Sequence, residues 1–139
     1  MSDAPTPETN EPAHDPEVLQ LATRIFELAR HGDRDTLAAY VDAGVPVNLT
    51  NERGDSLLML ASYHGHASSV TALLERGADA NRANDRGQTP LAGAVFKGED
   101  EVLEALLAGG ADPLAGQPSA LETARMFERE DLVRRFTQR

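Results

Sequence analysis

Apolar residues recur along the chain at helical spacing, in short segments separated by Gly, Asn and Asp. Residues three and four apart lie on one face of an α-helix, so two of these segments predict helices with a buried apolar stripe. The stripe consists of Val70, Leu73 and Leu74 in one segment and of Leu103, Leu106 and Leu107 in the other.

A shorter helix is predicted before each of these stripes. Ser56 and Thr89 stand at its N-cap position, where a side-chain hydroxyl accepts a backbone N–H. Pro90 follows at the first helical position, where its missing donor costs nothing. Gly65 and Gly98 are expected to end this helix in the left-handed conformation. Its apolar members lie three residues apart and are Leu58, Ala61, Leu91 and Ala94.

Glycine positions show that these elements repeat at a constant spacing along the chain. Gly32, Gly65 and Gly98 are evenly spaced along the chain. The distance from one of these glycines to the next is the length of one repeat unit, which we call the repeat period. Three further columns have the same period, and they are Gly44, Gly77 and Gly110, then Gly54 and Gly87, then Thr23, Ser56 and Thr89. Several columns at one period indicate a stacked array of equal units. The units are residues 18–50, which form an N-terminal cap, 51–83, 84–116, and a C-terminal cap, 117–139, shortened by three residues.

Residues 1–16 have a different composition from the array. They hold four of the eight prolines among Thr, Glu, Asn and Asp, and they lack the apolar residues needed for a core. We therefore expect a disordered acidic arm over residues 1–16, followed by the repeat domain over residues 17–139. The arm has no basic region and no apolar h-region, so it is not a secretory signal, and a cytoplasmic location is expected.

The charge of the chain argues against two classes of partner. Net charge is −10, from 23 acidic and 13 basic residues, which disfavours nucleic acid and anionic membrane surfaces. The chain has no cysteine, so no disulfide or thiolate site can form. Lys97 is its only lysine, whereas arginine and alanine abound, which favours a GC-rich, bacterial genome.

The two central units resemble ankyrin repeats, whose pattern runs G-x-T-P-L-H-x-A-A-x-x-G-H, then an apolar helix, then L-L-x-x-G-A-D-x-N. The matching stretches are GDSLLMLASYHGH with LLERGADAN, and GQTPLAGAVFKGED with LLAGGAD. The resemblance covers residues 18–136 and implies an all-α repeat fold. That fold is an ankyrin-type solenoid of helix-turn-helix units with protruding β-turn or hairpin loops.

This sequence departs from the family pattern at a few positions. Met59 and Ala92 replace the histidine that follows T-P-L, which puts its usual hydrogen bonds between hairpins in doubt. Gly93 occupies a helix interior, at a cost of about 1 kcal/mol relative to alanine. Glu99 replaces the histidine after the helix-ending glycine.

The resemblance implies a non-catalytic module that binds a protein partner, with regulation of that partner as one role. We expect no cofactor, no metal, and a monomer in the absence of the partner. The binding residues implied are the hairpin tips and the exposed positions of each first helix. The tip residues are Glu52, Arg53, Asp55, Asp85, Arg86 and Gln88, and the helix residues are Tyr63, His64, Phe96 and Lys97, adjoined by Met59 and Ala92. Of these, Tyr63, Phe96 and Met59 are expected to be exposed, as aromatic anchors of an interface often are.

Two alternative functions rest on short motifs. Residues 53–56 read Arg-Gly-Asp-Ser, which in an extracellular loop is an adhesion ligand. In phase with it stands Arg86-Gly87-Gln88-Thr89, so the arginine, the glycine and the hydroxyl recur as a hairpin leading to a helix cap. A small hydrolase or metalloprotein is the other alternative, because His64 and His66 flank Gly65. No further ligands stand at metal spacing, and no nucleophile motif is present, so we expect no enzyme.

Two charged groups have a structural interpretation. The carboxylate pairs Glu99–Asp100 and Glu130–Asp131 are expected in helix first turns, where the helix dipole favours them. The C-terminal LVRRFTQR predicts a capping helix with Val133 and Phe136 in its buried layer. Its arginines are expected on a solvated face, although they could dock on an acidic surface; they are Arg134, Arg135 and Arg139.

Overall fold

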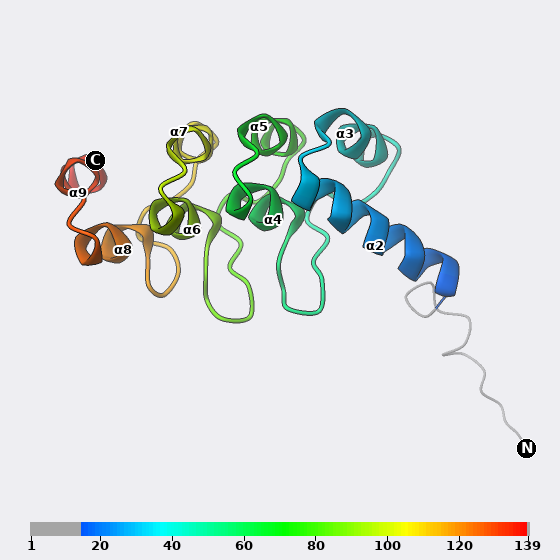
Figure 1. Ribbon diagram of the computed structural model, residues 1–139, viewed down its shortest axis with the longest axis horizontal. Helices are drawn as coiled ribbons and strands as arrows, with labels where there is room; N and C mark the ends of the chain where they lie inside the picture. The colour runs from blue at the N-terminus through cyan, green and yellow to red at the C-terminus, as the bar shows by residue number, and fades with distance from the viewer. Residues whose placement is uncertain (1–14, 139) are drawn as a thin grey trace, which may run out of the picture.

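The computed structural model describes residues 15–138, which form two stacked rows of helices (Figure 1). The inner row consists of α2 (Pro16–His31), α4 (Leu57–Tyr63), α6 (Pro90–Lys97) and α8 (Ala120–Met126). The outer row consists of α3 (Arg34–Asp42), α5 (Ala67–Glu75), α7 (Asp100–Ala108) and α9 (Glu130–Thr137). Each unit supplies one helix to each row, which confirms the predicted all-α repeat fold. None of the described helices is both long and apolar enough to cross a membrane.

The predicted caps set the ends of the inner helices. Ser56 Oγ accepts the N–H of Met59 at 3.0 Å, and Thr89 Oγ1 accepts the N–H of Ala92 at 3.3 Å. Glycines follow these helices with positive φ, as predicted: 81° at Gly65 and 71° at Gly98. A hydroxyl cap and a left-handed glycine therefore limit α4 and α6 to about two turns each.

The hydrophobic core lies between the two rows and runs through all four units. The paired positions Leu58, Ala61, Leu91 and Ala94 are all buried, as the helical spacing predicted. Each inner helix packs on the next inner helix and on the outer helix of its own unit. Phe136 of α9 is buried and Val133 is partly buried, so the last helix covers the apolar end of the array.

The first unit differs from the others because α2 is 16 residues long. Thr23 keeps the phase of Ser56 but lies inside this helix, where its hydroxyl donates to the carbonyl of Leu19 at 2.9 Å. Residues 18–22 contain no Gly, Asn or Asp to form a turn, so the helix continues through the position of the hairpin. It starts at Pro16 with Asp15 as its N-cap. The rest of the expected arm, residues 1–14, lies outside the described residues.

Three loops connect an outer helix to the next inner helix, and the last is the shortest. The loops over residues 43–56 and 76–89 are equal in length, whereas the loop over residues 109–119 is three residues shorter. The predicted deletion of three residues therefore falls in the third loop, which projects less far than the other two in Figure 1.

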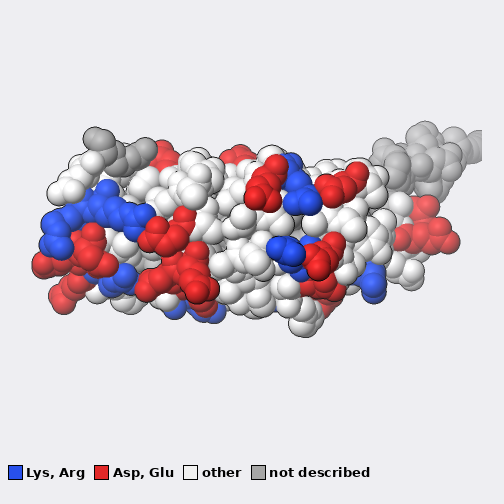
Figure 2. Space-filling model, turned by 90° about the horizontal axis from the view of Figure 1, so that it is seen from above, with Lys and Arg blue, Asp and Glu red and all other residues white. Residues whose placement is uncertain are grey.

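Ion pairs connect the outer helices to one another. Arg76, the C-cap of α5, pairs with Asp42 of α3 at 2.9 Å, and Arg135 of α9 pairs with Glu104 of α7 at 2.6 Å. Figure 2 looks onto this outer face and shows basic side chains lying beside acidic ones. Arg135 thus docks on an acidic side chain of its own array, while Arg139 lies outside the described residues.

Candidate functional site

Two hairpins, residues 51–56 and 84–89, project from the inner row, and an asparagine organises each of them. The side-chain oxygens of Asn51 and Asn84 each accept hydrogen bonds from the backbone N–H groups two and four residues later, at 2.9 and 3.0 Å. These bonds close both tips into the same shape. Neither asparagine was among the predicted site residues, although the two stand one repeat period apart.

Adjacent hairpins are also bonded to each other. The Asn84 side-chain amide donates to the carboxylate of Asp55 at 2.8 Å, and the N–H of Asp85 donates to the carbonyl of Arg53 at 3.0 Å. The hairpins are therefore connected even though neither unit has the histidine of the repeat pattern. As a result, the two tips form one continuous surface.

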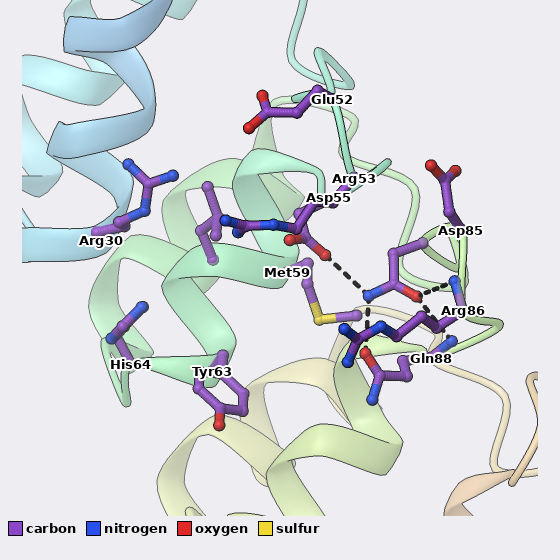
Figure 3. A pocket seen from close by; sticks show the side chains of 12 residues that line it. Arg30, Glu52, Arg53, Asp55, Met59, Tyr63, His64, Asp85, Arg86 and Gln88 are labelled. Carbon is purple, nitrogen blue, oxygen red and sulfur yellow. Dashed lines mark hydrogen bonds between the residues drawn. The ribbon is translucent and has the colours of Figure 1, made fainter.

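The first groove is an open space of about 780 Å³ between these hairpins and helix α4 (Figure 3). Nine of the twelve predicted binding residues line it: Glu52, Arg53, Asp55, Met59, Tyr63, His64, Asp85, Arg86 and Gln88. The structure adds Arg30, Leu60 and Asn84 to the lining. Arg30 was missed because it belongs to the degenerate first unit, where no hairpin marks the phase.

The second groove, of about 280 Å³, continues the first toward helix α8. It shares Met59, Tyr63 and Gln88 with the first groove and adds two predicted residues, Ala92 and Phe96. Its remaining lining residues were not predicted and are Thr89, Gly93, Pro118, Thr123 and Met126. We refer to the surface of both grooves as the inner face.

The expectation that Met59 is exposed is wrong, because only 6% of this residue is accessible. Helix α4 lies between α2 and α6, and these neighbours cover most of its surface. Ala92, one unit later, is buried for the same reason. Tyr63 and Phe96 sit at the ends of their helices and are exposed as expected, at 43% and 59%.

Aromatic rings extend the inner face toward the C-terminal unit. The ring of Phe96 meets that of Phe127 edge to face, with centroids 5.5 Å apart. Met126 beside them is also exposed. The Lys97 ammonium lies 4.1 Å from the centroid of the Tyr63 ring, a cation–π contact that joins α6 to α4. Lys97, the twelfth predicted residue, therefore contacts the groove wall without lining either groove.

The histidines lie in a basic environment. Burial lowers the pKa of the His64 imidazole, and four neighbouring basic side chains lower it further. These are Lys97, His66, Arg30 and His31. His66 Nε2 donates to the carbonyl of Arg30 at 2.7 Å, so this histidine joins the first two units. Within residues 15–138, no three His, Asp or Glu side chains come together as a metal site requires.

The carboxylate pairs at 99–100 and 130–131 lie at helix starts, as predicted. Asp100 is in the first turn of α7, and Glu130 and Asp131 are in the first turn of α9. Asp131 accepts hydrogen bonds from Arg129 at 3.2 Å, which lowers the pKa of this carboxyl group. These carboxylates stabilise helices through the dipole and do not line either groove.

The Arg-Gly-Asp-Ser stretch forms one of the hairpins and the cap that follows it. Ser56 is buried as the N-cap of α4, and Gly54 has a φ of 78°. Asp55 is partly buried and bonded to Asn84. In this stretch only the side chain of Arg53 extends into the first groove without a hydrogen-bonding partner in the described chain.

Three comparisons relate the chain to known proteins. The family model for ankyrin repeats (3 copies) matches residues 25–116. An ankyrin repeat protein of Pseudomonas aeruginosa is 47% identical over 63 residues, which are 45% of this chain and 34% of that protein. The crystal structure of the human ASB11 ankyrin repeat domain matches with a TM-score of 0.61 and 35% identity, over 64% of this chain and 40% of that one. The matched regions thus cover well under half of each relative.

Proposed function

Because this chain belongs to the ankyrin repeat family, we propose that it is a non-catalytic module that binds a protein partner on its inner face and regulates that partner. Ankyrin repeats generally act in protein–protein interaction, and the family is generally non-catalytic. We further propose a bacterial source, a cytoplasmic location and a monomeric state without the partner. The relative from Pseudomonas aeruginosa supports the source.

The observation that carries this proposal is a pair of exposed aromatic side chains at equivalent positions of two units. Tyr63 and Phe96 are one repeat period apart, and both line the second groove. The whole chain has only four Phe and two Tyr, so their placement on one open face is informative. Exposed aromatic clusters next to polar hairpins are typical of protein-binding surfaces.

The test is a double variant, Tyr63→Ala with Phe96→Ala, compared with the unchanged protein. Both are immobilised and exposed to lysate of the source organism, and the retained proteins are identified by mass spectrometry. A partner retained by the unchanged protein is expected to be lost from the double variant, whose circular dichroism remains helical.

The control is Leu114→Ala. Leu114 is as exposed as Phe96, at 59%, but lies in the third loop outside both grooves. This variant is expected to retain the partner. Equal retention by all three proteins would show that the inner face is not the binding surface.

A further inference from the structure

The two grooves differ in chemistry and share one wall, so a single extended ligand can occupy both. Charged and amide side chains of the hairpins line most of the first groove, whereas mostly apolar groups line the second. Met59, Tyr63 and Gln88 belong to both. A ligand that fits this face therefore carries a charged part and an apolar part next to each other.

Two arginines stand at equivalent tips over the first groove. Within residues 15–138, neither Arg53 nor Arg86 forms an ion pair. Five other arginines do pair with carboxylates, and they are Arg30, Arg34, Arg76, Arg129 and Arg135. Among the described residues, four more arginines have no ion pair, and they are Arg24, Arg82, Arg125 and Arg134. Arg53 and Arg86 differ from these four because they line the first groove.

The carboxylates closest to these arginines along the chain do not form ion pairs with them. Asp55 accepts the hydrogen bond of the Asn84 amide at 2.8 Å. In Figure 3 the side chains of Arg53 and Arg86 extend toward helix α4. Within residues 15–138, Glu52 and Asp85 also line the first groove but form no ion pair with either arginine. The two guanidinium groups are thus presented to the groove.

One basic group stands beside the wall shared by the grooves. The Lys97 ammonium lies 4.1 Å from the centroid of the Tyr63 ring, where the two grooves meet. Lys97 also contributes, after burial, to the lowered pKa of the neighbouring His64 imidazole.

The second groove has space for an apolar side chain above Gly93. A Cβ atom added to Gly93 would meet no other heavy atom within 4 Å, so this part of helix α6 is uncovered. Phe96 and Met126, which are 59% and 63% exposed, stand beside it. A groove of about 280 Å³ accommodates one large apolar side chain of a partner.

We infer that the inner face binds an extended acidic peptide segment of a partner protein. Its carboxylates pair with Arg53 and Arg86, and a neighbouring apolar side chain fills the groove above Gly93. Arginine–carboxylate pairs give strong, directional hydrogen bonds, and a buried apolar anchor supplies much of the affinity at many interfaces. The overall negative charge repels acidic segments at long range, so binding depends on these local contacts. The inference rests on the proposed function and specifies the partner.

A random peptide library displayed on phage provides the probe, with the full-length protein as bait. The enriched peptides are expected to carry acidic residues beside one aromatic or large aliphatic residue. One enriched peptide, labelled with fluorescein, then gives a Kd by fluorescence anisotropy.

Variants separate the two parts of the site. The double variant Arg53→Gln with Arg86→Gln is expected to weaken peptide binding about tenfold or more, because both carboxylates lose their partners. The control, Arg82→Gln with Arg134→Gln, removes the same charge from exposed arginines outside both grooves. It is expected to change the Kd by less than about twofold. Gly93→Leu replaces glycine with a better helix former in α6 and fills the groove, so it is also expected to weaken binding about tenfold.

Several outcomes would overturn the inference. Enrichment of basic or uncharged peptides excludes an acidic ligand, and a library that yields no enriched peptide does the same. Displacement of the peptide by single-stranded oligothymidine would show that charge alone is recognised. If the Tyr63→Ala, Phe96→Ala variant loses the peptide while the variants of Arg53 and Arg86 keep it, the proposed function stands and this inference fails. If none of these substitutions affects binding, both fail.

Discussion

A residue with positive φ follows each inner helix, and in the last unit that residue is a glutamate. Gly32, Gly65 and Gly98 have φ values of 76°, 81° and 71°, and Glu128 has 57°. Glycine adopts this conformation freely, whereas a residue with a Cβ atom is strained by about 1–2 kcal/mol. The fourth unit therefore carries a local strain that the other three avoid.

Replacing Glu128 with glycine is expected to stabilise the protein. Relief of the strain outweighs the extra freedom of glycine in the unfolded chain, for a net gain of about 0.5–1 kcal/mol. The melting temperature should rise by about 2–4 °C, as measured by circular dichroism. Glu101→Gly is the control, because Glu101 is exposed inside helix α7. There the same substitution should destabilise by about 1 kcal/mol, and a loss at both positions would contradict the assignment of strain to Glu128.

Single residues were predictable where local chemistry decides their role. A hydroxyl before a helix and a glycine after it act through backbone groups a few residues away, so Ser56, Thr89 and Gly98 could be assigned from sequence. Burial of Met59 could not, because helices far apart in the sequence cover it. The repeat spacing placed Met59 on the inner face but gave no information on how much of its side chain is exposed to solvent.

One asparagine side chain holds each hairpin together. Comparing variants of Asn51 and Asn84 tests how much these hydrogen bonds stabilise the protein. The Asn84 side chain takes part in four hydrogen bonds. Its oxygen accepts two from backbone N–H groups, and its amide nitrogen donates two, to the side chains of Asp55 and Gln88. The oxygen of Asn51 makes the same two bonds, but its amide nitrogen is buried without a partner among the described residues. Helix α2 occupies the place where a preceding hairpin would supply one.

Asn84→Ala is therefore expected to destabilise the protein more than Asn51→Ala does. The losses in free energy of unfolding should be about 2 kcal/mol for Asn84→Ala and about 1 kcal/mol or less for Asn51→Ala. Urea denaturation of both variants measures the difference. Equal losses would mean that the amide bonds of Asn84 add nothing to the stability of the hairpins.

Helix α9 closes the C-terminal end of the described array. It packs on α8, and charged side chains connect it to α7 through Arg135 with Glu104 and Arg129 with Asp100. The hydrogen bonds from Arg135 hold the pKa of Glu104 below its ordinary value. A lowered pKa in the folded state means that this pair stabilises the protein above the ordinary glutamate pKa, and that the contribution disappears as the pH falls through the folded-state value.

The variant Glu104→Gln tests this connection. Near pH 7 it should lower the free energy of unfolding by less than about 1 kcal/mol, because both side chains are half exposed to solvent. As the pH falls below the ordinary glutamate pKa and through the lowered folded-state value, the melting temperatures of the variant and the unchanged protein should converge, because protonation removes the charge that the variant lacks. Thermal melts across this range provide the measurement. A difference that persists or grows in acid would assign the effect to packing rather than to charge.

Elements were predictable where the same signals recurred at the repeat period. The first unit lacks one of these recurring signals. Thr23 stands one repeat period before Ser56, but residues 18–22 contain no turn residue, so helix α2 continues through this position. Asn51 and Asn84 did recur, and a search for polar columns as well as glycine columns would have found them. The asparagines that hold the hairpins together were therefore detectable in the sequence. The length of α2 was harder to predict, because it depends on the absence of turn residues from 18–22.

The whole array could be inferred from sequence because each unit contacts only its neighbours, so one period defines the architecture. The two grooves could not be inferred in the same way. The deletion of three residues was visible, but its effect depends on which loop it shortens and on which side chains that loop would otherwise cover. Pro118, Thr123 and Met126 correspond to Gln88, Gly93 and Phe96 only when the deletion is placed in the third loop, so the sequence did not identify them as groove residues beforehand.

The short third loop also gives the inner face a direction. The two hydrogen-bonded hairpins before α4 and α6 form one continuous edge, and the loop before α8 projects less far (Figure 1). A polypeptide bound along this edge can continue past α8 without meeting a third hairpin of equal length. The face is therefore open to a stretch from the middle of a long chain, such as a linker between two folded domains, and is not restricted to a free terminus.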